Sequence, residues 1–340
     1  MWGRPRHDGR AAAYATFGAT PLHSGPGPPY AWGLPALPVM TLRNVLVPTD
    51  LSPAAERAFG PVAELAVHHG ATVTVVQVTA EPSAPASGTV TRVDGPDIGD
   101  QAFELVPVTD VEDEASDVAA AIVEQARRTD ADLIVMGTHG RSGLSRLRLG
   151  SVAEAVTRAA PCPVLLVRTE ADLDGWRLRR VLAAVDPGDL DTADPDPGDP
   201  DLVPAQAQRA ADLAASFGAH LDLLAVAERS PDRGYPSLRR CAANLLSITV
   251  RLARRPSAPA RVDYIVRQGD PVDAIVAEAE RTEADLVVVG TRRRGLRRLV
   301  LGSVAEGVAR RSPCPVLVVL PDRASSVRQL DEEPVALAQA

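Results

Sequence analysis

The sequence contains no lysine, so arginine and histidine supply all of its basic side chains. Aromatic residues make up only 3% of the chain, so its cores must be built from Ala, Val and Leu, which suits helices packed on a parallel sheet. The three cysteines form no CxxC pair and no Cys/His cluster, so neither a zinc site nor a disulfide framework is indicated. No apolar run approaches the roughly 20 residues that span a bilayer, so we expect a cytoplasmic protein without a membrane partner. The net charge of −8 argues against a nucleic-acid partner.

The length of 340 residues suggests two domains of about 150 residues each. Residues 1–40 are rich in Gly, Pro and Arg and show neither helical nor strand periodicity, so we expect a disordered N-terminal extension. Met40 directly precedes the first expected strand and is a candidate for the natural start of translation. Residues 322–340 are expected to form a flexible tail.

The remainder of the chain is an internal repeat, which predicts two copies of one domain at residues 41–170 and 177–321. Residues 149–167 align with residues 301–319, and 14 of these 19 positions are identical. The preceding strands also match, because one reads Ala-Asp-Leu-Ile-Val-Met-Gly-Thr and the other reads Ala-Asp-Leu-Val-Val-Val-Gly-Thr.

Each copy alternates apolar runs with helical patterns, which predicts an α/β fold of two tandem Rossmann-like domains. Each domain is expected to hold a five-stranded parallel sheet flanked by helices. Residues 133–136 lack period-two alternation, as expected for a strand buried on both faces, whereas residues 118–126 carry apolar residues at helical spacing. Ligands bind such sheets at the carboxyl ends of the strands. Those ends are expected at Asp50 and Asp186 for the first strands and at Gly137 and Gly290 for the fourth strands.

One loop of the first copy has the chemistry of a phosphate site. It reads Gly137-Thr-His-Gly140, then nine residues, then Gly150-Ser151 at the start of a helix. Glycine lets the backbone approach a ligand closely, and a helix N-terminus offers free N–H donors and the positive end of its dipole. Ser151 is expected to cap that helix. The loop is neither a Walker P-loop nor a Gly-x-Gly-x-x-Gly motif.

At these residues the chain resembles the universal stress protein family, whose nucleotide-binding branch carries the same Gly-x2-Gly-x9-Gly-Ser spacing. The strand that ends in Val-Pro-Thr-Asp50 and the closing Pro-Cys-Pro-Val-Leu-Leu-Val segment also match. The resemblance implies a fold like that of the adenine nucleotide α-hydrolases, and bound ATP with or without Mg²⁺. By position, it implies a site made of Pro48, Thr49 and Asp50 beside the adenine and ribose, Val78 at the adenine edge, Met136, Gly137, His139 and Gly140 along the ribose and phosphates, and Gly150, Ser151, Val152 and Ala153 at the phosphates.

The second copy departs from this pattern. Its loop reads Gly290-Thr-Arg-Arg293, so arginine replaces the second glycine, and the spacing to Gly302-Ser303 is one residue short. An acidic insert at residues 187–201 follows its first strand and would repel a triphosphate, although the arginines at 292–298 would attract one. We expect weak or no ATP binding in this copy.

Several conspicuous residues have simple structural interpretations. His139 is read as a ligand contact or a solvated loop residue, since no clear carboxylate partner lies near it in sequence. Cys162 and Cys314 lie between prolines and are read as buried packing. His68 and His69 end a helix, where a positive charge is favourable.

Three functions stay open at this point. The first is a nucleotide-binding stress-response or signalling module, because no credible nucleophile–base set is present. The second is slow ATP hydrolysis, which the wider superfamily makes conceivable. The third is an interaction scaffold without a nucleotide, in which residues 163–168 and 315–320 pair as strands to form a pseudo-dimer within one chain. A homodimer of whole chains is also open.

Overall fold

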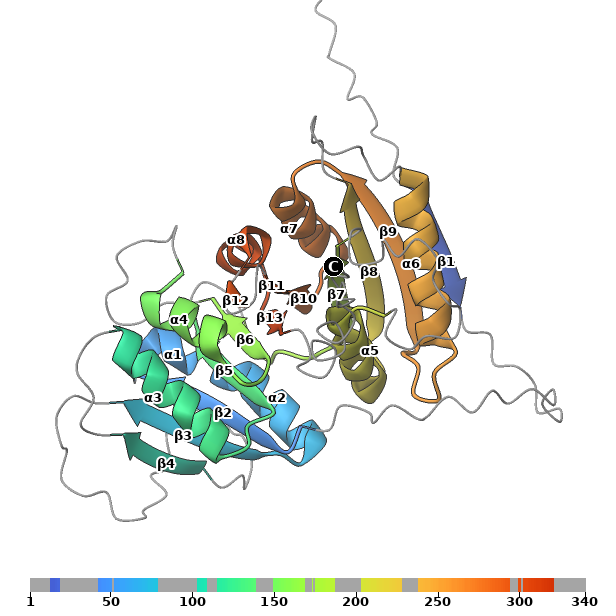
Figure 1. Cartoon of the computed structure of the whole chain (residues 1–340). Coiled ribbons are helices and arrows are strands. Elements are labelled where there is room, and N and C mark those ends of the chain that lie inside the picture. Colours follow the sequence, from blue (N-terminus) through green and yellow to red (C-terminus); the bar gives the residue numbers. More distant parts are fainter. Residues whose placement is uncertain are drawn as a thin grey trace, which may run out of the picture.

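The computed structural model describes residues 13–18, 42–50, 52–78, 103–108, 115–138, 149–168, 173, 175–186, 203–227, 238–293, 299–300 and 302–320. These residues form an 11-stranded sheet with helices on both faces, and a separate two-stranded hairpin (Figure 1). The order of the strands in the large sheet is β1-β9-β8-β7-β10-β13-β6-β5-β2-β3-β4.

The first copy supplies the five strands at one end of this sheet. Its order, β4-β3-β2-β5-β6, places the first strand of the copy in the middle, and all four neighbouring pairs are parallel. The elements are β2 (Asn44–Thr49), α1 (Pro53–Glu56), α2 (Phe59–His69), β3 (Thr72–Val78), β4 (Phe103–Val108), α3 (Ala115–Arg128), β5 (Leu133–Gly137), α4 (Ser151–Ala159) and β6 (Val164–Val167).

The second copy repeats this arrangement as β9-β8-β7-β10-β13, again with parallel neighbours. The predicted pair of five-stranded parallel sheets is therefore confirmed. The elements are β7 (Arg180–Val185), α5 (Ala205–Phe217), β8 (His220–Ala227), α6 (Leu238–Ala253), β9 (Arg261–Gln268), α7 (Pro271–Thr282), β10 (Leu286–Gly290), α8 (Ser303–Arg311) and β13 (Val316–Val319), with the hairpin β11 (Arg292–Arg293) and β12 (Leu299–Val300) between β10 and α8.

One strand lies where the sequence predicted disorder. β1 (Ala13–Gly18) pairs antiparallel with β9, with Ala13 opposite Val266 and Gly18 opposite Arg261. The prediction for residues 1–40 is therefore corrected for these six residues. The physical reason is tertiary: β9 is an edge strand of the second copy with unpaired backbone groups, and a six-residue segment that holds Tyr14, Thr16 and Phe17 has enough β-propensity to pair with it.

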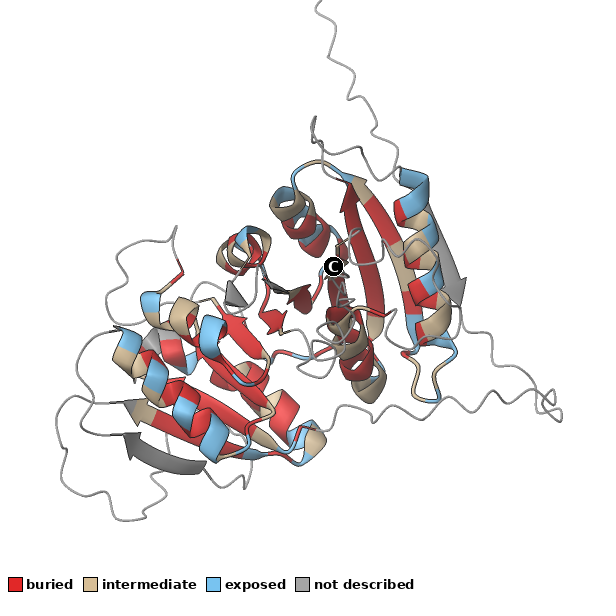
Figure 2. Ribbon diagram, in the orientation of Figure 1, coloured by how far each residue is buried: buried red, intermediate tan, exposed pale blue. Residues whose placement is uncertain are grey.

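Two apolar layers cover the faces of the sheet. Helices α2, α5 and α6 pack on one face, where residues of both copies join a single buried cluster. Helices α3, α4, α7 and α8 pack on the other face around a second cluster. Figure 2 shows the consequence, because the central strands are buried along most of their length. This burial on both faces explains why runs such as β5 show no alternation of apolar and polar residues.

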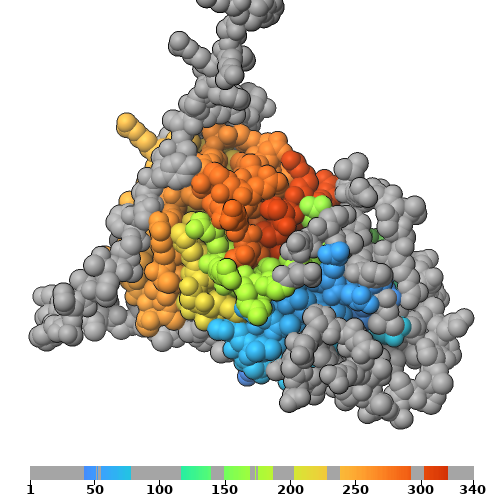
Figure 3. All heavy atoms as spheres, turned by 180° about the vertical axis from the view of Figure 1, so that it is seen from behind, coloured from blue at the N-terminus to red at the C-terminus, as the bar shows by residue number. Residues whose placement is uncertain are grey.

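The two copies meet edge to edge in the middle of the sheet. β6 and β13 pair antiparallel, with Leu165 opposite Leu317, so the closing strands pair within one chain. The ends of α2 and α5 also meet there: the His68 ring stacks on Phe217 with ring centres 3.8 Å apart, and its Nε2 lies 2.8 Å from the carbonyl oxygen of Ser216. Seen from behind, blue atoms of the first copy lie directly against yellow and yellow-green atoms of the chain, beyond which lies the orange part of the second copy (Figure 3).

Among the described residues, no helix has both the length and the apolar character that are needed to span a bilayer.

Candidate functional site

The predicted site begins at the carboxyl end of β2. Pro48 and Thr49 are buried in that strand, and Asp50 follows it directly. The Asp50 Oδ1 atom accepts a hydrogen bond of 3.0 Å from the backbone N–H of Ser52. Ser52 in turn caps α1, because its hydroxyl accepts from the N–H of Ala55. One oxygen of Asp50 is therefore engaged in a local turn, which holds its carboxylate at the end of the strand.

The neighbouring strand β5 carries the start of the glycine loop. Thr138 directly follows Gly137 and is fully buried, at 0% exposure. Its N–H donates to the carbonyl of Val167 over 2.9 Å, and its carbonyl accepts from the N–H of Gly150 over 2.8 Å. These two bonds tie Thr138 to the last strand of its copy and hold Gly150 beside it at this edge of the sheet.

Among the described residues, no side chain caps the helix that follows. Gly150 is the N-cap residue of α4 and has no side chain to bond the first turn, while Ser151 is the first helical residue and is exposed. The prediction that Ser151 caps this helix is therefore wrong by one position. Because the first N–H groups of a helix have no partner within it, the N–H groups of Ser151, Val152 and Ala153 are the donors that an anion would meet.

The other predicted residues divide into three groups. Val78 ends β3, at the same edge of the sheet, which agrees with a role for its backbone. The Met136 side chain is buried in the apolar cluster beneath α3 and α4, so only its backbone is available. His139 and Gly140 lie outside the described residues.

The equivalent edge of the second copy is filled by a side chain. A Cβ atom on Gly290 would lie only 2.9 Å from Oε1 of Gln206, which belongs to α5 and is 7% exposed. The counterpart of Gln206 in the segment Asp50-Leu-Ser-Pro-Ala-Ala55 is Ala55, since the second copy reads Asp-Leu-Val-Pro-Ala-Gln206. Gln206 therefore occupies space beside β10 that the alanine of the first copy cannot fill.

Sequence reasoning missed the parts played by Thr138 and Gln206. The sequence did carry a signal for Thr138, because Gly-Thr occurs at the end of β5 and again at the end of β10. Thr291, the threonine of the second copy, likewise donates its N–H to the last strand of its copy, at Val319. No local signal marks Gln206, which lies 84 positions before Gly290.

The buried thiols show little capacity for nucleophilic chemistry. Cys162 and Cys314 are free and buried, as predicted. Burial raises the pKa of each thiol to about 12, so both are protonated near neutral pH. Their part in the structure is packing.

A surface groove in the second copy lies along α7 and the end of β9. It is lined by residues that include Gly269, Asp270 and Glu278. Glu278 is buried and pairs with Arg267 over 2.6 Å and with Arg281. These internal ion pairs account for the charges along the groove without a ligand.

Comparison with known proteins agrees with this architecture. The model of the universal stress protein family matches residues 41–168 and 199–319. Universal stress protein A homolog 1 of Coxiella burnetii is 32% identical over 141 residues, which cover 38% of this chain and 97% of that protein. A universal stress protein of Methanocaldococcus jannaschii is 60% identical over 50 residues, and this match spans only 29% of its length and 15% of this chain.

The fold of the whole tandem also has a solved counterpart. The crystal structure of a putative universal stress protein from Pseudomonas aeruginosa matches with a TM-score of 0.56 and 19% identity, covering 85% of this chain and 97% of that chain. The family model matches both copies and most of the chain. The chain therefore belongs to the universal stress protein family.

Proposed function

We propose that the first copy binds an adenine nucleotide, with ATP as the leading ligand, and that the chain acts as a nucleotide-responsive stress or signalling module. The observation that carries this proposal is the start of α4, where the N-cap residue is glycine and no side chain of the described residues bonds the first turn. Its glycine N-cap lies directly beside β5, to which the 2.8 Å bond between Gly150 and Thr138 ties it. A phosphate at this position would accept from backbone N–H groups and meet the positive end of the helix dipole.

The position of the candidate site supports the same proposal. It lies where β2 and β5 end, and β2 and β5 are the strands between which the order of connection reverses. In parallel sheets this switch point is where ligands bind. The loop spacing from Gly137 to Ser151 agrees with the nucleotide-binding pattern of the family, and Mg²⁺ would accompany a bound triphosphate.

The second copy is proposed to bind no nucleotide of its own. Gln206 takes up the space beside Gly290, and arginine stands where the loop pattern requires its second glycine. One nucleotide per chain is the expected stoichiometry.

The test is isothermal titration of the full chain with ATP, with and without Mg²⁺, using two matched variants. Gly150→Asp introduces a favourable N-cap residue that keeps α4 folded while its carboxylate occupies the N–H donors and repels phosphate. The N-cap angles, φ −58° and ψ 142°, accept any residue. Gly302→Asp makes the same change at the N-cap of α8 in the second copy, where a Cβ meets nothing within 4 Å.

The wild-type chain should bind about one ATP, Gly150→Asp should weaken binding at least about tenfold, and Gly302→Asp should leave it unchanged. A wild-type chain that binds no adenine nucleotide, including AMP and cyclic AMP, would refute the proposal. If Gly150→Asp bound ATP as tightly as the wild-type chain, the nucleotide would bind somewhere other than the start of α4. A turnover assay with the same samples separates a binding module from a slow hydrolase.

A further inference from the structure

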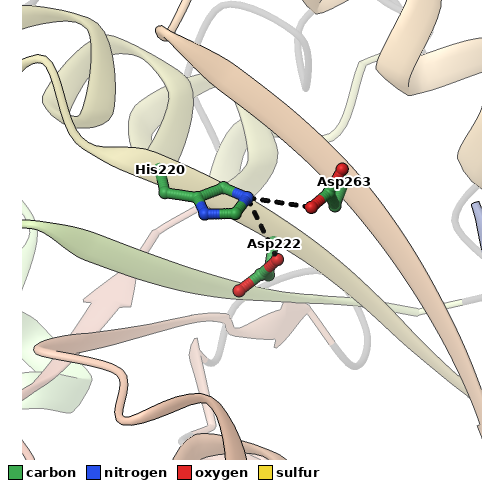
Figure 4. Close-up of side chains that lie close together, drawn as sticks. All are labelled: His220, Asp222 and Asp263. Carbon is green, nitrogen blue, oxygen red and sulfur yellow. Dashed lines mark hydrogen bonds and ion pairs between the residues drawn. The ribbon is translucent and has the colours of Figure 1, made fainter. Parts of the chain in front are cut away.

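A second cluster of ligand-type side chains lies in the second copy, at the amino ends of its strands and so at the opposite edge from Gly290. His220 is the first residue of β8, and Asp222 follows two positions later on the same face of the strand. Asp263 of β9 is the direct neighbour of Asp222 in the parallel register. All three are therefore held by backbone pairing near the amino ends of these strands. Figure 4 shows their polar ends pointing toward one another.

The spacing of the cluster is that of donors around one cation. The Nε2 atom of His220 lies 3.0 Å from Oδ2 of Asp263 and 3.6 Å from Oδ1 of Asp222. One ligand atom from each residue lies within 4.8 Å of the other two. Ligands about 2.1 Å from a tetrahedral metal ion are about 3.4 Å apart, so the three residues need only small side-chain adjustments to share one ion.

The carboxylate oxygens of the cluster are unevenly satisfied. Arg180 bonds Oδ2 of Asp222 over 3.2 Å, and Arg261 bonds Oδ2 of Asp263 over 2.9 Å. Oδ1 of Asp263 is buried and has no hydrogen-bond partner within the described part of the chain. Oδ1 of Asp222 faces His220 at 3.6 Å, which is too long for a hydrogen bond, although the Asp222 side chain is only 3% exposed. A single proton on His220 can bond only one carboxylate, so it cannot compensate both.

We propose that His220, Asp222 and Asp263 form a binding site for one divalent transition-metal ion. An imidazole nitrogen with two carboxylate oxygens is a donor set that suits zinc and its neighbours, and a water molecule would complete four-fold coordination. The Arg180 guanidinium holds Oδ2 of Asp222, the oxygen that does not face His220, and so orients the other oxygen toward the ion. The Arg261 guanidinium bonds Oδ2 of Asp263, the oxygen that also faces His220, which leaves the unpartnered Oδ1 of Asp263 as an additional ligand atom. Both guanidinium groups also offset the carboxylate charge, so the site binds more weakly than one with uncompensated anions. The ion would join β8 to β9 and would act apart from the nucleotide loop.

Zinc chloride is the probe for this site, titrated into the full nucleotide-free chain by calorimetry. We expect about one zinc ion per chain and a thermal unfolding midpoint that rises with zinc concentration, as ligand linkage requires. Cobalt chloride offers a second readout, because bound Co²⁺ gives a visible absorption spectrum that reports its coordination.

Two variants test the ligands directly. Asp263→Asn keeps the shape of the side chain, and His220→Gln keeps a donor toward Asp263 but removes the imidazole. Each should lower zinc affinity at least about tenfold and abolish the cobalt spectrum. Asp212→Asn is the matched control, because Asp212 is a buried carboxylate that pairs with Arg255 over 2.7 Å outside the cluster. His68→Gln controls for binding at an exposed histidine.

The controls should bind zinc as the wild-type chain does. A wild-type chain that takes up no zinc or cobalt would overturn the proposal, and the cluster would then be an ion network closed by a proton on His220. Zinc binding that persists in both His220→Gln and Asp263→Asn would place the ion elsewhere. Circular dichroism of each variant shows whether it is folded, so the two ligand variants cannot both mislead through unfolding.

Discussion

The last two helices of each copy pack against each other through different residues in the two copies. This difference predicts that one substitution, Gly307→Ala, changes from destabilising to stabilising when its neighbour Val272 is also replaced. In the second copy, a Cβ atom on Gly307 of α8 would lie 2.7 Å from Cγ2 and 3.1 Å from Cγ1 of Val272 in α7. The aligned residues of the first copy are Ala155 in α4 and Ala119 in α3. One copy therefore uses glycine against valine where the other uses two alanines.

The size of the effect follows from opposing contributions. Alanine is favoured over glycine within a helix by roughly 0.5–1 kcal/mol, but overpacking costs about 1–3 kcal/mol, and the β-branched Val272 has few alternative rotamers. Gly307→Ala should therefore destabilise the chain by about 1 kcal/mol. Val272→Ala removes two methyl groups from a partly buried side chain, which should also cost about 1 kcal/mol.

The double variant recreates the alanine pair of the first copy. Once Val272 is alanine, the clash is gone, so adding Gly307→Ala should stabilise the chain by roughly 0.5–1 kcal/mol. The coupling between the two sites is then about 1.5–2 kcal/mol, within the range found for residues in contact. Ala155→Gly in α4 is a matched control, which should lose helix stability without any dependence on Val272.

Urea unfolding followed by circular dichroism measures these differences, and hydrogen exchange of α8 locates them. The reasoning would be refuted if Gly307→Ala had the same effect with valine and with alanine at position 272. It would also fail if Gly307→Ala stabilised the wild-type chain, because the close approach of α7 and α8 would then be absent in solution.

Three further predictions concern other parts of the chain. Oδ2 of Asp285 accepts hydrogen bonds from the N–H groups of Arg179 and Arg180, both over 2.8 Å. Asp285→Ala should therefore lower the free energy of unfolding, measured in urea, by about 2 kcal/mol. Asp285→Asn keeps an acceptor and should lower it by less. Burial, together with the nearby His68, lowers the pKa of His69 below its usual 6.5. As pH falls, His69 is therefore protonated in the unfolded chain before it is protonated in the folded chain. The free energy of unfolding should accordingly decrease as pH drops below about 6.5. His69→Leu should flatten that fall, and an unchanged slope between pH 8 and pH 5 would contradict the assignment. Because burial raises the pKa of Cys162 and Cys314 to about 12, a thiol reagent at pH 8 should label neither residue in the folded chain and both in urea, and rapid labelling of the folded chain would count against their burial.

The fold could be predicted from the sequence because each kind of element produces a recognisable pattern of nearby residues. Buried parallel strands leave apolar runs, helices leave a 3.6-residue period, and the repeat shows the strands and the closing segment of the domain twice. The position of Asp50 and Gly137 at the ends of adjacent strands follows from the same logic. These features depend on residues that are near one another in the chain.

The features that sequence reasoning missed depend on contacts between distant segments. β1 forms because the edge of β9 offers unpaired backbone groups to a segment about 250 positions earlier. Gln206 reaches Gly290 only when α5 packs against β10. Asp132 is a third example, because the sequence showed it only as part of a repeated strand. In the structure its carboxylate accepts hydrogen bonds from the N–H groups of Arg43 and Asn44 and so joins β5 to β2. The error at Ser151 was smaller, because helix boundaries are uncertain by a residue or two.

The antiparallel pairing of β6 with β13 has a consequence for how the two halves can evolve and operate. In a dimer of separate identical chains, every substitution appears on both sides of the two-fold axis, and the assembly separates on dilution. Here the partner strand belongs to the same polypeptide, so its effective concentration is set by the connecting segment and not by the amount of protein in the cell. The interface can persist at any expression level, and each half is free to accumulate changes that the other does not share.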